Sequence, residues 1–479
     1  MRALAVKAVA VRAGVISGAT AILLLLAYEV AHGTPKMFGL GILAALAVPL
    51  CLLAIERPLV FPLGFYIVLA PFGDMAVPHI GTLNKLLGIV TFGAILFALI
   101  RRGELVKPSA SVLVWLGFLI WMGISGFWSI DPTHWQQSYV TIAQNFILYA
   151  AVALVIATRA DVEILATCAV IGGLAAAAVA LWPLITGGTI LSAGARISLP
   201  SENPHLHPDP NIFAASLLLP YAILFASTIA SRRLVPIVAN ASGLLLIVVT
   251  IVLSGSRASM LAIVALTLFI LLANPRHRLI ALGLLIIAGS AIAPFTFYIV
   301  SRWSNAISSG GAGREEIWKV AWLAFQQHWL FGWGFGSFEA AYDKFVLQAP
   351  LRYYVSWHRA PHDIFLQTAV DLGIVGILLV GVAFFVQFRD LSLPRSNDFL
   401  NDLRIALQAT MLAFCVEAIF LDFLDRKFLW VLFMLIALVR STLIEKRRTA
   451  CATTSLPTLV PALPQTRSIA SSNLSGTVG

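Results

Sequence analysis

Long apolar runs separated by short polar segments occupy most of the chain between residues 13 and 445. A helix needs about 17–25 apolar residues to cross a hydrocarbon core of about 30 Å. Lipid offers the backbone no hydrogen-bond partner, so each run is expected to be a helix. The alternating pattern of a membrane barrel is absent. The runs predict helices at residues 13–31, 38–55, 59–73, 85–100, 111–128, 139–157, 164–186, 211–230, 234–253, 258–273, 278–300, 364–388, 404–424 and 427–444.

Two of these runs, 59–73 and 258–273, are short enough to be broken helices, so the pattern predicts 12–14 membrane spans. Composition agrees with a membrane protein, because only 11% of the 479 residues are charged, against about 25% in soluble domains. The net charge of +10 could suggest nucleic acid, but the basic residues are scattered over the turns. Most of them fall in turns on the same side of the membrane as the N-terminus, so the positive-inside rule predicts that both termini are cytoplasmic. This topology explains the positive charge, and we expect no nucleic-acid partner.

This topology predicts an all-α polytopic protein that is surrounded by membrane lipids, with one large loop on the outer side. The loop contains the pattern of an amphipathic helix at 315–327, which we expect to lie flat on the membrane surface. The Ser, Thr and Pro content of the tail predicts disorder. The predicted parts are a cytoplasmic N-terminus at 1–12, transmembrane helices at 13–300, the outer loop at 301–363, further transmembrane helices at 364–445 and a cytoplasmic tail at 446–479.

Four basic residues on the outer side lie beside or within apolar runs, where a charged group is a functional candidate by default. They are Lys85, Arg196, Arg257 and Arg314. Arginine stays charged, and its planar fork of donors matches two phosphate oxygens. If these side chains face one cavity, they would bind a diphosphate. The alternative for Arg257 is that it caps a helix C-terminus or extends to the lipid headgroups.

A histidine stands where the large loop returns to the membrane, in Pro361-His362-Asp363. An unperturbed imidazole has a pKa of about 6.5, which suits proton transfer at neutral pH. His362 is therefore a candidate general base. The alternative is a residue at a helix N-terminus that contacts the headgroup region.

Other polar patterns predict less. The segment Gly332-Trp-Gly-Phe-Gly336 lacks the strand and helix of a dinucleotide site and predicts a tight turn. His205 and His207 would need His358 to form a metal site, and the prolines around them favour a rigid turn instead. The outer loops contain no Asp-x-Asp, and the cysteines suggest neither a disulfide framework nor a thiolate site. We expect no metal and no cofactor.

Four motifs together resemble the O-antigen ligase/polymerase superfamily of bacteria, over about residues 190–390. They are Ser-Gly-Ser-Arg at 254–257, Gly-Arg with a following Trp at 313–318, Gly-x-Gly-x-Gly-Ser at 332–337, and a histidine followed by Leu-Gln and an acidic-x-Gly at 362–373. Two positions differ from the commoner pattern, because Asp363 replaces Asn and Asp371 replaces Glu.

The resemblance implies a multi-pass glycosyltransferase of the inner membrane, of the GT-C-like class, whose active site faces the periplasm. Such enzymes take a glycan from undecaprenyl diphosphate without a metal or nucleotide sugar. A ligase delivers it to lipid A–core in lipopolysaccharide biosynthesis, whereas a polymerase extends the lipid-linked glycan. The single long loop favours a ligase, which must admit a bulky lipid acceptor from the side. A small-anion transporter would use the same arginines, but the inverted repeats typical of transporters are not evident.

Within that reaction, each candidate residue has an expected role. Arg257 and Arg196, supported by Lys85, would hold the diphosphate and stabilise the charge that develops on the leaving group. Arg314 would contact the diphosphate or the acceptor. His362 would take the proton of the acceptor hydroxyl, with inversion at the sugar carbon, and Asp363 would orient the imidazole.

Overall fold

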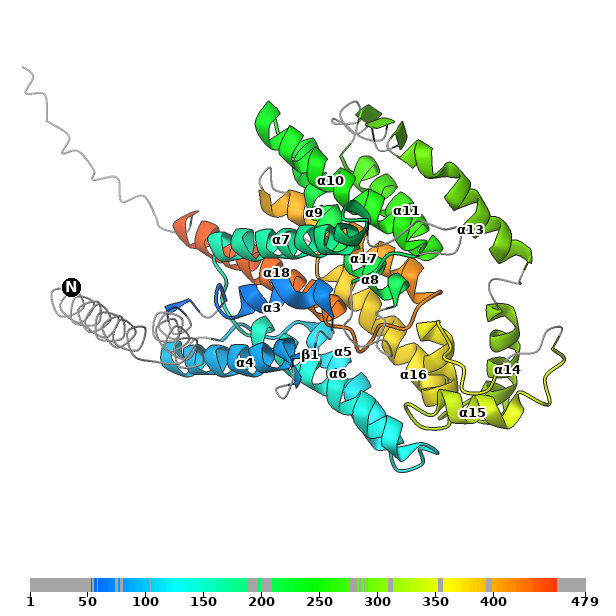
Figure 1. Ribbon diagram of the computed structural model, residues 1–479. Helices are drawn as coiled ribbons and strands as arrows, with labels where there is room; N and C mark the ends of the chain where they lie inside the picture. Colours follow the sequence, from blue (N-terminus) through cyan, green and yellow to red (C-terminus); the bar gives the residue numbers. More distant parts are fainter. Residues whose placement is uncertain are drawn as a thin grey trace, which may run out of the picture.

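In the residues that it describes, the computed structural model consists of helices and connecting segments, apart from one hairpin of two short strands (Figure 1). It describes residues 53, 56, 57 and 59–454, except 74–75, 78–80, 104, 188–195, 200–208, 275–281, 284–285, 288, 291, 309–312, 352–355 and 393–398. The elements are α3 (Leu63–Leu69), η1 (Ala70–Phe72), β1 (Ala76–Val77), β2 (Gly81–Thr82), α4 (Leu83–Arg102), α5 (Ala110–Ser125), α6 (Pro132–Ala153), α7 (Arg159–Ile185), α8 (Pro210–Ser216), α9 (Leu218–Ala230), α10 (Leu234–Ser254), α11 (Arg257–Ala273), η3 (Ala293–Phe295), α13 (Thr296–Ser308), α14 (Arg314–Gln327), α15 (Phe338–Phe345), α16 (Ile364–Arg389), α17 (Phe399–Ala418) and α18 (Lys427–Thr454).

The all-α polytopic membrane fold that the sequence predicts is confirmed. Within the described part of the chain, 7 helices are long and apolar enough to cross a membrane, and they are Asn84–Arg101, Arg159–Ile185, Pro210–Ala230, Leu234–Ser254, Ile364–Arg389, Phe399–Ala418 and Lys427–Glu445. Shorter apolar helices cover Leu63–Phe72, Ala110–Ser125 and Arg257–Ala273. The predicted span at 13–31, all of 38–55 except residue 53, and the beginning of 278–300 lie outside the described residues, so the number of spans stays a prediction.

The core of the bundle forms where α17 packs against both α9 and α11, and where α16 packs against α5. Large aromatic side chains fill the space between α5, α6, α16 and α18. The rings of Trp115 and Phe433 have centroids 5.2 Å apart, and the Tyr149 and Trp430 rings lie within 6.0 Å of each other. Many apolar side chains on the outside of the bundle, such as Ile89 and Leu268, remain exposed, as expected of surfaces that face lipid.

The amphipathic helix α14 does not use its apolar face as predicted. Ile317, Val320, Ala321 and Ala324 are buried in a small second core with α15 and the first part of α16. The expectation that this face lies on the membrane surface is therefore wrong, because it is already covered by protein. Figure 1 shows α14 and α15 together at one end of α16, on the opposite side of the molecule from α4.

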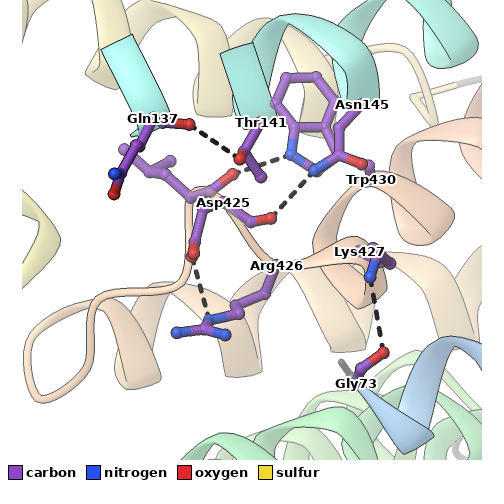
Figure 2. Close-up of polar contacts among 9 residues, drawn as sticks. Gly73, Gln137, Thr141, Asn145, Asp425, Arg426, Lys427 and Trp430 are labelled. Carbon is purple, nitrogen blue, oxygen red and sulfur yellow. Dashed lines mark hydrogen bonds and ion pairs between the residues drawn. The ribbon is translucent and has the colours of Figure 1, made fainter. Parts of the chain in front are cut away.

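The loop between α17 and α18 is fixed to several other elements. Hydropathy extends the predicted helix to residue 424, but α17 ends at Ala418. Asn145 of α6 donates through Nδ2 to the carbonyl oxygen of Asp425 at 2.9 Å, and Lys427 Nζ lies 3.5 Å from the carbonyl oxygen of Gly73 (Figure 2). The Arg426 guanidinium pairs with the Asp425 carboxylate at 3.1 Å. These contacts hold the loop that follows Glu417 against α6 and the segment after η1.

Candidate active site

The site is built around the turn between α10 and α11. The turn residue Gly255 adopts a φ of 65°, in the left-handed region that glycine favours, and this lets α10 stop and α11 begin almost at once. The Ser256 side chain caps α11 by accepting a hydrogen bond from the backbone N–H of Ser259. Arg257 is thereby placed as the first residue of α11, so it lies at the N-terminus of a helix and not at a C-terminus.

Both Arg257 and Arg314 begin helices, which is the wrong end for a cation. A helix N-terminus carries partial positive charge from its unpaired N–H groups, so it favours anions and disfavours arginine. Residues that break such a local rule are expected at functional sites. A phosphate placed between these two helix starts would meet both the guanidinium groups and the positive helix ends.

Arg196 reaches the same turn from a segment far away in the sequence. Its Nε donates to the carbonyl oxygen of Ser254 at 2.8 Å, and its Nη2 donates to Asn211 Oδ1 at 2.6 Å. The neighbouring Ile197 N–H donates to the carbonyl oxygen of Leu253 at 3.1 Å. The chain around Arg196 therefore lies along the last turn of α10.

Arg314 is close enough to Arg257 for the two charges to interact. Burial lowers the pKa of the Arg314 guanidinium, and the charge of Arg257 lowers that pKa further. Its guanidinium carbon lies 5.9 Å from the centre of the Phe420 ring, in the loop after α17. Three carboxylates raise the Arg314 pKa in return, namely Asp209, Glu417 and Asp363.

His362 completes the cluster just before α16. Burial lowers the pKa of its imidazole, and the charge of Arg314 lowers that pKa further. Both effects favour the neutral imidazole, which is the form that can accept a proton. The backbone of His362 has a φ of 51°, an uncommon conformation for a residue with a side chain. Strain of this kind is often found at functional sites.

A carboxylate from the segment just before α8 also acts on His362. Asp209 raises the His362 pKa, against the effect of burial and of Arg314. Asp363, the residue predicted to orient the imidazole, instead caps α16, and its Oδ1 accepts from the Leu366 N–H at 2.9 Å. Among the described residues, no hydrogen bond joins Asp363 to His362. The orienting role of Asp363 therefore stays a prediction.

Lys85 is placed differently from the three arginines. It is exposed near the start of α4, and its neighbour Asn84 is buried and bonds to the carbonyl oxygen of Leu69 at 3.0 Å. Because η1 packs against α8, this end of α4 lies on the same side of the bundle as the site. The contacts described for the arginine cluster do not include Lys85.

Glu417 of α17 belongs to the cluster and was not predicted. Its carboxylate is fully buried, and its Oε1 accepts a short hydrogen bond from Ser259 in the first turn of α11. The other oxygen, Oε2, is buried without a hydrogen-bond partner among the described residues. Glu417 lies within an apolar run, where an ionisable residue is a functional candidate, so its position in the sequence was a signal that it belongs to the site.

The turn at 332–337 is a structural support of the site. Its Gly336 N–H donates to Asp371 Oδ2 at 3.0 Å, and the Gly334 N–H donates to the backbone oxygen of Asp371 at 2.9 Å. A Cβ on Gly373, which has a φ of 67°, would lie 2.3 Å from the carbonyl oxygen of Leu330. The acidic-x-Gly motif and the glycine-rich turn therefore bind each other and fasten the large loop to α16.

Replacement of Gly373 should destabilise this support. We expect Gly373→Ala to lower the melting temperature of the purified protein, because the side chain meets backbone and because the φ of 67° and ψ of −163° lie in a region that is essentially restricted to glycine, where another residue costs about 1–3 kcal/mol. Gly381, in the same helix, is the matched control, since a Cβ there meets nothing within 4 Å. Equal melting temperatures for Gly373→Ala and Gly381→Ala would contradict the support role.

Of the three histidines considered for a metal site, only His358 belongs to the described residues. His205 and His207 lie outside them. His358 is exposed, and its Nδ1 lies 2.7 Å from Asp343 Oδ2, on the surface of the loop. The side chain of His358 is therefore engaged with the loop that carries it.

Taken together, the helices and the cluster define a polytopic α-helical membrane protein with three arginines, a histidine, the buried carboxylate of Glu417 and the half-buried carboxylates of Asp209 and Asp363 at one end of its bundle. Residues 242–381 match the family model described as O-antigen ligase, and this stretch includes Arg257, Arg314 and His362. The match covers less than a third of the chain, and it supports the resemblance to the O-antigen ligase/polymerase superfamily that the motifs predict. Arg196, Asp209 and Glu417 lie outside the matched residues. No curated protein matches the chain.

Proposed function

We propose that the protein is an O-antigen ligase that transfers a polysaccharide from undecaprenyl diphosphate to lipid A–core, on the periplasmic face of the inner membrane. The observation that supports the proposal is the convergence of Arg196, Arg257 and Arg314 beside the partly buried imidazole of His362. The match of residues 242–381 to the O-antigen ligase family model supports glycosyl transfer from a lipid-linked donor as the reaction class.

The arginines suit the diphosphate of the donor. One guanidinium group can donate two parallel hydrogen bonds to two oxygens of a phosphate, and it keeps its charge even when it is partly buried. Burial lowers the Arg314 pKa most, and the like charge of Arg257 lowers that pKa further. A diphosphate between the two guanidinium groups would be attracted by both, and it would also meet the N-termini of α11 and α14.

His362 suits the acceptor side of the same reaction. Its imidazole would accept the proton of an acceptor hydroxyl while the hydroxyl oxygen forms a bond to the anomeric carbon of the donor sugar. The bond between that carbon and the diphosphate breaks, and undecaprenyl diphosphate leaves with the electron pair. Attack opposite the leaving group inverts the anomeric carbon. The arginines would stabilise the negative charge that grows on the diphosphate.

A deletion strain distinguishes this function from the alternatives. We expect lipid-linked glycan of normal length to accumulate while lipid A–core carries none, and a plasmid copy of the gene to restore the capped form. Accumulation of single repeat units on the lipid carrier would instead indicate a polymerase. Normal lipopolysaccharide with a defect in anion uptake would contradict both and support a transporter.

A further inference from the structure

We propose that the apolar turn after α14, formed by Trp329, Leu330 and Phe331, is inserted among the acyl chains of the membrane and anchors the large loop to lipid. The three residues are 55%, 39% and 51% exposed, respectively. The contact is made by this turn and not by the apolar face of α14, which is buried against protein. The inference goes beyond the proposed function and does not depend on it.

The depth of the apolar turn follows from its bond to α16. The backbone N–H of Ile374 donates to the carbonyl oxygen of Trp329 at 2.9 Å, so the turn lies beside Ile374. The helix ends at the exposed Arg389, which marks the opposite surface of the membrane, because an arginine is costly within hydrocarbon. The stretch from Ile374 to Arg389 spans only about 22 Å at about 1.5 Å per residue. Since the hydrocarbon core is about 30 Å thick, the apolar turn lies inside its edge, and any tilt of α16 would place it deeper.

The helix α5 places its neighbouring residue Phe127 at a similar depth. Near the start of α5, Ser111 donates to Asp390 Oδ2 at 2.6 Å, so α5 begins where α16 ends. The distance from Ser111 to Ser125, where α5 ends, is about 21 Å at about 1.5 Å per residue. Phe127 follows in the next turn and is 91% exposed. The end of α5 therefore also lies within the hydrocarbon core.

The apolar turn continues a surface of α5 that already faces lipid. The ring centroid of Phe331 lies 5.7 Å from that of Trp121 and 6.4 Å from that of Trp128, at the end of α5. Tryptophan is enriched where a protein surface meets the edge of the hydrocarbon core. Exposed apolar residues recur every three or four positions towards this end, on one face of the helix, and they are Leu113, Leu116, Ile120, Ile124 and Phe127.

The backbone beside the apolar turn is bonded within the protein, as a position in lipid requires. The Gly332 N–H donates to the carbonyl oxygen of His328 at 2.8 Å, and the Trp333 N–H donates to that of Val370 at 2.9 Å. The sequence between Lys319 and Glu339 contains no Asp, Glu, Lys or Arg. What the turn presents to its surroundings is therefore apolar, which suits acyl chains and not water.

The test measures whether position 330 meets lipid or water. A bimane label is attached to Leu330→Cys in full-length protein whose four native cysteines are replaced by alanine and whose melting temperature is that of the wild type. The protein is placed in nanodiscs, so that iodide reaches both faces. We expect brominated phosphatidylcholine to remove at least about half of the fluorescence, because the label lies among acyl chains, and iodide to remove little.

Two control positions calibrate the measurement. A label on Leu268→Cys, which is exposed on the outside of the bundle in α11, should respond like position 330. A label on Arg159→Cys, at an exposed ion pair on the surface, should be quenched by iodide and not by the lipid.

Quenching by iodide at position 330 as strong as at position 159 would overturn the inference, because the turn would then lie in water. Protection from both quenchers would also overturn it, and it would indicate a covering protein such as a second copy. If Leu330→Cys is not recovered in folded form, Phe127→Cys carries the same test. The readout requires no turnover, so an absence of transfer activity would bear only on the proposed function.

Discussion

Replacement of Arg257 by alanine is expected to lower the transfer rate by about 10²–10³-fold, the usual cost of removing a group that stabilises developing charge. Arg257→Lys keeps the charge but loses the planar fork, so at least a tenfold loss is expected there as well. The rate would be measured on purified protein in lipid, with a lipid-linked glycan as donor.

A matched substitution separates this effect from a general cost of changing an arginine. Arg159 lies on the surface at the start of α7 and pairs with Glu163 at 2.7 Å. Exposed pairs of this kind contribute about 0–1 kcal/mol to stability, so Arg159→Lys should leave the transfer rate within twofold of wild type. An Arg257→Ala variant with the same melting temperature and a normal rate would remove this residue from the mechanism.

Loss of His362 is expected to impair turnover far more than donor binding. General-base catalysis contributes about 10²–10⁴-fold to a rate, so His362→Ala should lose that factor while its affinity for undecaprenyl diphosphate changes little. Burial and the charge of Arg314 lower the His362 pKa. The imidazole therefore stays neutral down to a pH below the ordinary histidine pKa of about 6.5. The wild-type rate should therefore fall only when the pH drops below about 6.5, as the base becomes protonated.

The neighbouring loop supplies a control for the histidine. His358 is exposed and bonds to Asp343, so His358→Ala should transfer at nearly the wild-type rate. A parallel loss of binding and rate in His362→Ala would make His362 a ligand of the diphosphate instead of a base. Near-normal transfer would make it structural, and the base would then have to be sought among Glu339, Asp343 and Asp363.

Hydropathy predicted most helices closely, because the length and composition of each apolar run determine whether it can lie in lipid. The prediction of 234–253 differs from α10 by one residue, and that of 364–388 differs from α16 by one residue. The end of α17 was predicted six residues too late, since Ile419, Phe420 and Leu421 are apolar but belong to the loop. Hydropathy does not distinguish an apolar loop that is packed within protein from a further turn of helix.

Local sequence could not reveal which distant residues share the site. Arg196, Arg257, Arg314 and His362 were each selected because of an unusual charge or position, and the structure brings these four together. The buried Glu417 and the half-buried Asp209 were missed, because their roles depend on contacts between segments far apart in the chain. The apolar face of α14 was assigned to lipid for the same reason, since its partners in α15 and α16 lie beyond its own pattern.

The most direct measurement is transfer by the purified protein in vesicles that contain undecaprenyl-diphosphate-linked glycan and lipid A–core, with a metal chelator present. The proposed ligase function predicts that glycan of unchanged length appears on lipid A–core and that undecaprenyl diphosphate is released. Glycan that stays on the carrier while it grows longer, or transfer that requires added Mg²⁺, would contradict it.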